Sequence, residues 1–281
     1  MNKKNILVGQ SGGPTAVING SLYGVICEGA RHSDAVGCVY GMINGIEGFL
    51  QDKYMDLGEE LSEGELELLK LTPAAYLGSC RYKLPEDLSV VFYQTIFEKL
   101  NDLNIGYFFY IGGNDSMDTI KKLSDYAILN GSKIRFMGVP KTIDNDLAVT
   151  DHTPGFGSAA KYIASIAKEV IRDGLVYDQQ NVTILEIMGR NAGWLTGAAA
   201  LAKCEDCEGP DMIFLPEVTF DVDEFMKKVA ELHKKKKSVV VAVSEGVKTA
   251  DGRYVCELTD GIDFVDAFGH KQLTGTARFL A

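Results

Sequence analysis

The sequence predicts an α/β protein with two lobes, each built on a mostly parallel sheet. Short apolar runs of strand length alternate along the chain with longer segments in which apolar residues recur at helical spacing. Several of these runs end in glycine-containing turns, as strands do in βαβ units. The 281 residues are 46% hydrophobic and 24% charged, which suffices for a sizeable core and for two lobes.

The elements expected in the first lobe, residues 1–156, follow from apolar period and turn residues. The chain opens with an apolar run over 5–9, and a glycine turn over 10–14 leads into apolar positions at helical spacing. A loop punctuated by Gly41, Gly45 and Gly48 follows the second strand. The remaining elements are strands over 36–40, 107–111 and 134–139 and helices over 88–103 and 117–129.

A cluster of glycine and proline over 153–158 separates this lobe from a second one, residues 157–281. Strands and helices alternate there too, which predicts a sheet covered on both faces. The expected elements are helices over 159–171, 195–202 and 222–232, strands over 181–187, 212–215 and 239–243, and a closing helix that begins at Phe268.

Charge and cysteine usage exclude several classes of protein. The net charge of −11 argues against nucleic acid or an anionic membrane surface as the main partner. No apolar run approaches the ~20 residues of a membrane helix, and no secretory signal opens the chain. We therefore expect a soluble, cytoplasmic protein with reduced thiols, in which Cys204 and Cys207 are loop thiols and not part of a zinc site.

Two polar stretches follow neighbouring strands, Ile111 to Asp118 and Pro140 to Asp146. In an open α/β sheet, ligands bind at the edge where strands end and helices begin. The first stretch offers two glycines and a helix start, which suit a bound anion. The second offers carboxylates and one lysine. Together they suggest transfer of a phosphoryl group to a hydroxyl.

Taken singly, these patterns also have ordinary structural interpretations. The turn Gln10 to Pro14 matches neither the P-loop nor the dinucleotide fingerprint, so it also suits a bare turn. The run Asp144 to Asp146 also suits a surface turn, and Arg81 also suits a surface arginine. Lys141 and Asp115 also suit a surface ion pair, which contributes only ~0–1 kcal/mol to stability.

Three motifs in order carry a family resemblance: Gly112-Gly113-Asn114-Asp115-Ser116, then Pro140-Lys141-Thr142-Ile143-Asp144-Asn145-Asp146, then Met188-Gly189-Arg190. They resemble those of 6-phosphofructokinases. Asp115 and Lys141 stand where ATP-using members typically have glycine, so the chain resembles the pyrophosphate-dependent branch. The resemblance runs from Ile6 to Leu273 and implies the phosphofructokinase fold of two Rossmann-like lobes. It also implies a longer protein, whose C-terminal part is missing after Ala281.

The resemblance implies a glycolytic transferase that reversibly moves a phosphoryl group from pyrophosphate to the C1 hydroxyl of fructose 6-phosphate, giving fructose 1,6-bisphosphate. The alternatives are an ATP-dependent 6-phosphofructokinase and a catalytically silent regulatory subunit that binds sugar phosphate. Retention of Asp144, Thr142 and Arg190 argues against the silent chain. A diacylglycerol- or NAD-kinase-like enzyme shares the Gly-Gly-Asp type of turn but leaves the other motifs unexplained.

The resemblance also assigns roles to individual residues. The first lobe binds the phosphoryl donor and the second binds the sugar phosphate. Asp144 matches the general base that takes the proton from the C1 hydroxyl, with Thr142, Arg81 and Lys141 as further catalytic residues. The donor-binding residues are Gly12, Gly13, Gly113, Asn114, Asp115, Ser116 and Lys141, and the substrate-binding residues are Thr142, Asp144, Asp146, Met188, Gly189, Arg190 and Glu245.

A magnesium ion and a second copy of the chain are further implications. Mg²⁺ is expected to bridge the phosphates of the donor beside Asp115 and Asn114. Most members have aspartate in place of Asn114, which still offers a carbonyl oxygen but lacks the negative charge. This allosteric family forms homo-oligomers, and we expect a homodimer. Asn181 stands where ATP-using bacterial members have an arginine that reaches a neighbouring subunit, so tetramers are not implied.

Overall fold

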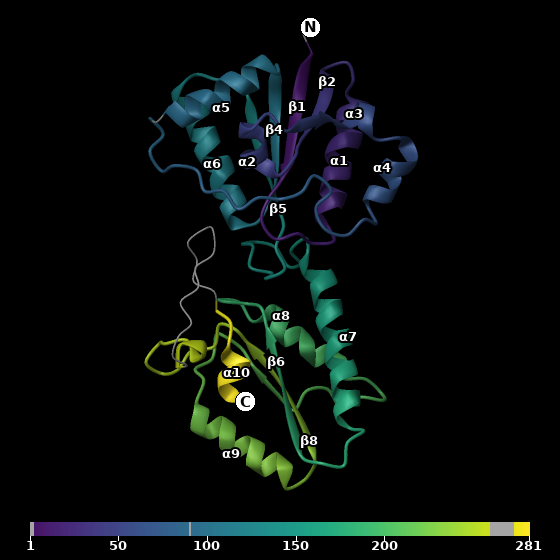
Figure 1. Ribbon diagram of the computed structural model, residues 1–281, viewed down its shortest axis with the longest axis vertical. Coiled ribbons are helices and arrows are strands. Elements are labelled where there is room, and N and C mark those ends of the chain that lie inside the picture. Colours follow the sequence, from purple (N-terminus) through teal and green to yellow (C-terminus); the bar gives the residue numbers. More distant parts are fainter. Residues whose placement is uncertain (1–2, 90, 259–272) are drawn as a thin grey trace. The chain divides into compact units, whose positions relative to one another are not determined.

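The computed structural model describes residues 3–89, 91–258 and 273–281 and confirms the mixed α/β fold with mostly parallel sheets (Figure 1). The chain divides into two compact units, Met1–Thr142 and Ile143–Ala281. This division comes earlier than the boundary expected between residues 156 and 157. The reason is packing: Ile143 and Phe156 both contact the core of the second unit, so the segment between them belongs to that unit.

The first unit is organised around a five-stranded sheet in the order β3-β2-β1-β4-β5. Its parallel strands are β1 (Lys4–Gln10), β2 (Val36–Met42), β4 (Ile105–Gly112) and β5 (Arg135–Pro140), and β3 (Tyr54–Asp56) is an antiparallel edge strand. The chain adds β2 on one side of β1 and β4 on the other. The strand order therefore reverses between β1 and β4, and a doubly wound sheet binds ligands at such a switch point.

Helices cover both faces of this sheet because successive side chains of a strand point to opposite faces. Leu7 of β1 belongs to one buried cluster, and its neighbours Ile6 and Val8 belong to another. The first cluster is closed by α2 (Gly45–Leu50), α5 (Val91–Asp102) and α6 (Asn114–Leu129), and the second by α1 (Ile18–Arg31), α3 (Leu57–Glu60) and α4 (Glu63–Leu69) (Figure 1).

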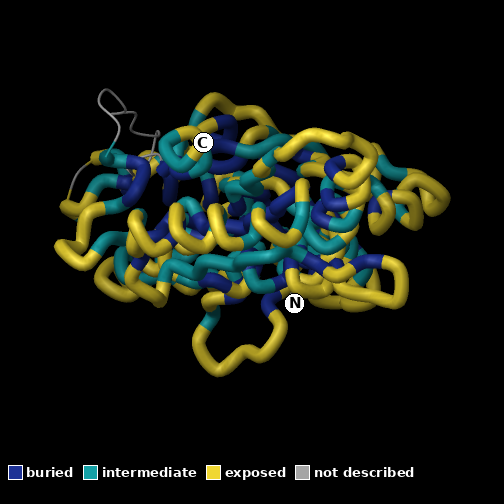
Figure 2. Tube along the Cα trace, turned by 90° about the horizontal axis from the view of Figure 1, so that it is seen from below, coloured by how far each residue is buried: buried dark blue, intermediate teal, exposed yellow. Residues whose placement is uncertain are grey.

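The second unit has a three-stranded parallel sheet in the order β6-β8-β7, formed by β6 (Asn181–Ile187), β7 (Met212–Phe214) and β8 (Ser238–Ser244). Every residue of the central strand β8 is buried. Figure 2 shows the exposed residues of the chain along coiled segments and loops at its surface. One core is covered by α7 (Phe156–Gly174), α8 (Trp194–Gly197) and the 3₁₀ helix η1 (Ala198–Ala202), the other by α9 (Val222–His233), the 3₁₀ helix η2 (Val255–Leu258) and α10 (Thr276–Leu280).

The expected glycine loop around residues 41–48 is wrong in part, because it contains helix α2. Asn44 and Gly45 turn the chain with φ values of 58° and 59°, and a Cβ on Gly48 would overlap the Ile43 carbonyl. These glycines therefore permit a tight entry into a helix that buries Ile46 and Phe49. The closing helix expected from Phe268 lies outside the described residues until Leu273.

The expectations on cysteine can be compared with the structure. None of the six cysteines, all of which lie in the described ranges, is part of a disulfide. Cys204 and Cys207 face each other across a tight turn, in which each backbone nitrogen donates to the other residue's carbonyl.

Across the described ranges, no helix combines the length and the apolarity that a bilayer crossing requires.

Candidate active site

The loops after β1, β4 and β5 converge at the switch point of the first unit. A Cβ built on Gly12 would lie 4.0 Å from the backbone nitrogen of Gly113, so the first two loops are in close approach. The backbone nitrogen of Lys141 donates to the Gly112 carbonyl at 2.9 Å, which joins the third loop to the second. Glycines far apart in sequence thus form one patch of closely approaching backbone, in which Gly13 is exposed and Gly12 and Gly113 are half-buried.

Steric requirements differ among these glycines. Gly12 has a φ of 76°, which an L side chain rarely adopts, and a Cβ on Gly112 would overlap the Ser116 hydroxyl. A Cβ on Gly13 would meet open space, and Gly13 is exposed. Nothing within the described chain therefore requires glycine at position 13, whereas a ligand that lies against the backbone would.

Helix α6 begins directly at this patch. Its N-cap residue Gly113 makes no side-chain capping hydrogen bond, although the first four N–H groups of a helix have no partner inside the helix. Asn114 is exposed, Asp115 is half-buried and Ser116 is buried at the first turn. The helix start combines N–H groups, which favour an anion, with the Asp115 carboxylate in the same turn.

Lys141 supplies positive charge to this patch. The residue is only 4% exposed, and its Nζ donates a hydrogen bond to the carbonyl of Gly13. In a chain of net charge −11, a buried ammonium beside a backbone patch is the kind of local group that holds an anion.

The segment that carries Arg81 is attached to the same turn. The Ser79 hydroxyl donates to the Gly12 carbonyl at 2.6 Å, and the Gly12 nitrogen donates to the Cys80 carbonyl at 3.1 Å. Arg81 follows these anchors with an exposed side chain. The structure therefore brings together all expected donor-site residues of the first unit and the backbone of Arg81.

In the second unit, the expected acceptor residues lie at the carboxyl ends of paired strands. Ile187 of β6 pairs with Ser244 of β8, so the loop Met188–Arg190 leaves beside Glu245. The Ser244 hydroxyl donates to the Gly189 carbonyl at 2.6 Å, and the Gly189 nitrogen donates to Glu245 Oε1 at 3.4 Å. These hydrogen bonds hold the loop after β6 against the loop after β8.

The charges around Glu245 link three expected site residues. Burial raises the pKa of the Glu245 carboxyl, and the negative charge of Asp144 adds to this rise. The Gly189 N–H and the positive charge of Arg190 act in the opposite direction. Asp144 and Arg190 therefore both lie close enough to Glu245 to affect its ionisation, whereas Met188 and Asp146 have exposed side chains.

Asn145 is a structural residue of the candidate site that the sequence did not single out. Its backbone is left-handed, with a φ of 59°; its Nδ2 donates to the Asp151 carbonyl at 3.2 Å, and its Oδ1 accepts from the Thr153 nitrogen at 2.8 Å. Asparagine adopts a left-handed backbone more readily than most residues, so its presence here was the sequence signal for a tight turn. The turn interpretation thus applies to Asn145, while its neighbour Asp144 is held half-buried.

Fold and site together define a doubly wound α/β protein whose carboxyl sheet edge carries glycine turns, a helix start and a buried lysine. The family model described as phosphofructokinase matches residues 5–280. The chain belongs to the phosphofructokinase family.

Two relatives and one solved structure have names that describe the same activity. The chain is 43% identical to the pyrophosphate–fructose 6-phosphate 1-phosphotransferase of Rhodospirillum rubrum over 98% of this chain and 66% of that protein. It is 42% identical to the enzyme of that name from Halomonas elongata, over 100% of this chain and 67% of the relative. A pyrophosphate-dependent phosphofructokinase from Nitrosospira multiformis superposes with a TM-score of 0.80 at 42% identity, over 89% of this chain and 62% of that one. The chain thus spans about two thirds of these relatives' length.

Proposed function

We propose that the protein transfers a phosphoryl group from pyrophosphate to the C1 hydroxyl of fructose 6-phosphate, reversibly, giving fructose 1,6-bisphosphate. The observation that carries this proposal is the patch at the β1/β4 switch point, where Gly12, Gly113 and the start of α6 meet the buried Lys141. The relatives of 42–43% identity that are named for this reaction support it.

Donor specificity follows from Asp115 and Lys141. A carboxylate in the first turn of α6 adds negative charge and bulk where the α-phosphate of a nucleotide would extend, so it disfavours ATP by repulsion. The Lys141 ammonium offsets charge on the two phosphates that remain. Gly12, Gly13, Asn114 and Ser116 complete the donor site with backbone and short side chains.

Asp144 acts as the general base in this proposal. It takes the proton from the C1 hydroxyl, while Arg81 and Thr142 stabilise the transferring phosphoryl group, whose oxygens carry the charge in the transition state. Met188, Gly189, Arg190 and Asp146 bind the acceptor, and Glu245 accepts hydrogen bonds from its hydroxyls. The proposed donor residues thus lie in unit 1, and the proposed acceptor residues lie in unit 2 except for Thr142, the last residue of unit 1.

Magnesium is the expected cofactor. The described residues contain no group of three or more His, Cys, Asp or Glu side chains that could hold a metal ion. This fits an ion that keeps waters and takes one or two protein oxygens beside substrate phosphates. Asp115 and the Asn114 carbonyl would supply those oxygens, and the bound ion would neutralise charge on the donor phosphates.

Two further features belong to the proposal. We expect the active protein to be a homo-oligomer, with a homodimer as the expected form. We expect it in the cytoplasm, where its proposed substrates are found and where thiols such as its six cysteines stay reduced.

Steady-state assays with fructose 6-phosphate and Mg²⁺, supplied with either pyrophosphate or ATP, test the function. We expect pyrophosphate to be used with the higher kcat/KM. Preference for ATP would refute the donor assignment, and absence of product with either donor would refute catalysis.

The substitution Asp115→Gly tests the cause of donor preference. Because it removes the repulsive carboxylate, we expect measurable use of ATP, with the KM for fructose 6-phosphate changed by less than ~3-fold. The control is Asp125→Asn, at a partly exposed carboxylate further along α6. Asparagine is used at this position because glycine would itself weaken the helix interior. Exclusion of ATP that persists in Asp115→Gly would contradict this role.

A further inference from the structure

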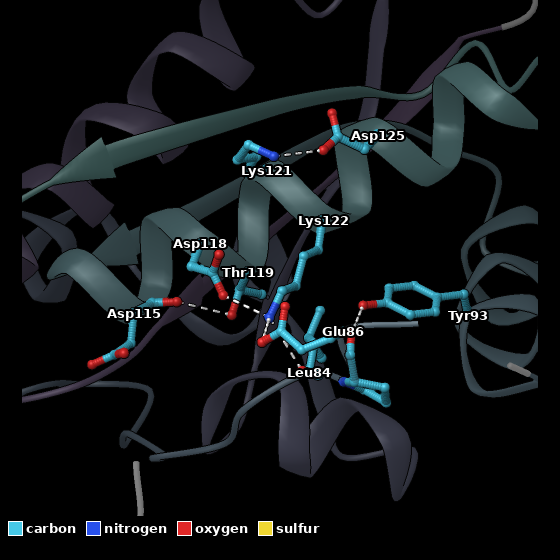
Figure 3. Close-up of polar contacts among 10 residues, drawn as sticks. Leu84, Glu86, Tyr93, Asp115, Asp118, Thr119, Lys121, Lys122 and Asp125 are labelled. Atoms are coloured by element: carbon cyan, nitrogen blue, oxygen red, sulfur yellow. Dashed lines mark hydrogen bonds and ion pairs between the residues drawn. The ribbon is translucent and has the colours of Figure 1, made fainter. Parts of the chain in front are cut away.

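Lys122, in the third turn of α6, is a buried lysine that the proposed mechanism does not use. Its side chain is 8% exposed, and its Nζ lies 2.8 Å from Asp118 Oδ2 and 2.8 Å from Glu86 Oε1 (Figure 3). It also donates to the Leu84 carbonyl at 3.3 Å. Asp118 is one turn earlier on α6, whereas Leu84 and Glu86 come from a different part of the chain.

Those two partners belong to the irregular segment that carries Arg81. Leu84 is buried in the first core, and the Tyr93 hydroxyl donates to the Pro85 carbonyl at 2.5 Å. The preceding end of the segment is bonded to Gly12 through Ser79 and Cys80. Arg81 therefore lies between two attachment points, the turn after β1 on one side and Lys122 on the other.

Helix α6 carries the other half of the donor site. Its first turn contains Asn114, Asp115 and Ser116, and the Thr119 hydroxyl donates to the Asp115 carbonyl at 3.1 Å. Figure 3 shows the Asp115 carboxylate directed away from the Lys122 ammonium, which instead faces Asp118 and Glu86. Lys122 thus contacts the Arg81 segment without contacting the candidate donor residues themselves.

We propose that Lys122 is a positioning residue for phosphoryl transfer: it fastens the segment that carries Arg81 to the helix whose first turn carries Asp115. This inference rests on the proposed function. Arg81 has a long, flexible side chain on a segment without regular hydrogen bonding, so its placement depends on where the backbone is held. A displacement of ~1 Å in such a group can lower the rate ~100-fold.

The chemistry of the contact favours a persistent attachment. Burial disfavours the charged ammonium, but hydrogen bonds to Asp118 and Glu86 outweigh it and raise the pKa of Lys122, so the charge is retained. A buried charge that loses its partners costs free energy. The ammonium therefore favours the arrangement in which it stays bonded to the Glu86 carboxylate and the Leu84 carbonyl. A neutral side chain of the same length fills the space but makes none of these bonds.

Lys122→Met, compared with Lys121→Met, tests the proposal. Lys121 is the adjacent lysine of α6, and its ion pair with Asp125 at 2.9 Å is exposed and stays within the helix (Figure 3). In the full protein, we expect Lys122→Met to speed amide exchange over residues 81–89 about 10-fold, and to lower kcat with pyrophosphate about 10- to 100-fold. The KM for fructose 6-phosphate should change by less than ~2-fold, because the acceptor residues lie in the second unit.

Two further variants guard against a general loss of folding. Glu86→Gln alters a partner that is 75% exposed and should give a smaller change in the same direction, and Lys122→Arg should restore most of kcat. Unchanged amide exchange in Lys122→Met, or an unchanged kcat despite faster exchange, would overturn the proposal. If wild-type protein used no pyrophosphate, the proposed function would fail on its own, and amide exchange would still decide whether Lys122 fastens this segment.

Discussion

Asp144 owes its position to a neighbour. The left-handed backbone of Asn145 and its two side-chain hydrogen bonds to residues 151 and 153 hold the turn, and Asp144 is kept half-buried in front of it. The negative charge of Asp144 is felt at Glu245, so the two carboxyls share one electrostatic environment. If Asp144 is the base, as proposed, it needs little reorganisation before it takes a proton.

Replacement of Asp144 by alanine tests its role as base. Because general-base catalysis acts mainly in the transition state, we expect kcat to fall ~10²–10⁴-fold while the KM for fructose 6-phosphate changes by only a small factor. Steady-state kinetics with saturating pyrophosphate and Mg²⁺ measure both parameters. Asp146→Ala, at the exposed carboxylate of the same turn, is the comparison. A near-normal kcat in Asp144→Ala would assign proton removal to another group.

Glu245 makes stability depend on pH in a defined direction. Its pKa is raised in the folded protein, so the folded state binds the proton more tightly than the unfolded state does. Its ionisation therefore lowers the stability progressively as pH rises from the unfolded pKa through the higher folded pKa. We expect Glu245→Gln to raise Tm at neutral pH, with a gain that shrinks below pH ~4.3, the ordinary pKa of a glutamate.

The same substitution should weaken the acceptor site. The amide keeps an oxygen for the Gly189 N–H but lacks the charge for the sugar hydroxyls, so the KM for fructose 6-phosphate should rise. Thermal unfolding at pH 4 and pH 7 gives the first readout and kinetics the second. A Tm gain that did not depend on pH would show that Glu245 ionisation is not its source.

Residue roles were only partly predictable from sequence. The glycines and acids after strands are visible as motifs because chain neighbours form them. The contacts of Lys122 with Leu84 and Glu86, and those of Ser79 with Gly12, join residues that the sequence separates widely. No local pattern encodes such pairs, since they depend on how the elements pack.

At the scale of elements, apolar period identified the long helices and every strand except the three-residue edge strand β3. The strand over 181–187 agrees with β6 residue for residue, because an apolar, β-branched run between polar flanks leaves little choice. The helix over 195–202 is wrong in part, since it continues as a 3₁₀ helix after Gly197. Helices α2, α3 and α4 were missed because four to seven residues are too short for a clear period.

The loop that follows β8 gives a test at the scale of elements. A Cβ on Gly246 would overlap the backbone carbonyl of Arg190, so Gly246→Ala must move one loop relative to the other. We expect kcat/KM for fructose 6-phosphate to fall ~10–100-fold, because small displacements of binding groups are costly. Gly197→Ala, where the added Cβ meets open space on a helical backbone, is the matched control and should be close to wild type.

These two alanine variants distinguish geometry from flexibility. Both remove the freedom of a glycine, but only Gly246→Ala creates an overlap. Equal losses in the two variants would mean that the interlock between the loops of β6 and β8 does not position the acceptor.

At the scale of the molecule, each unit has its own cores on both faces of its own sheet. The number of lobes and their parallel sheets could be predicted, because alternating elements permit few other arrangements. The position of the boundary between the units could not be predicted. Residues 143–156 form a largely irregular segment, and the packing of Ile143 and Phe156 decides to which unit it belongs.

Leu7→Ala tests the first unit's core. Leu7 is fully buried in the middle of β1, so we expect the substitution to lower the free energy of unfolding by ~2–5 kcal/mol. Leu129→Ala is the matched control, because Leu129 is 73% exposed at the end of α6 and should change stability by less than ~0.5 kcal/mol. Urea denaturation followed by circular dichroism measures both, and similar losses in the two variants would contradict the packing described here.

The boundary after Thr142 also bears on how such a protein can evolve. Every candidate donor residue, from Gly12 to Lys141, is encoded before it, and the acceptor residues from Asp144 to Glu245 are encoded after it. A single recombination event between the codons for residues 142 and 143 would transmit an entire phosphate cradle to another lineage and leave the recipient's sugar-binding loops intact. Under the proposed function, donor preference could therefore change by one exchange of gene segments as well as by substitution at Asp115 and Lys141.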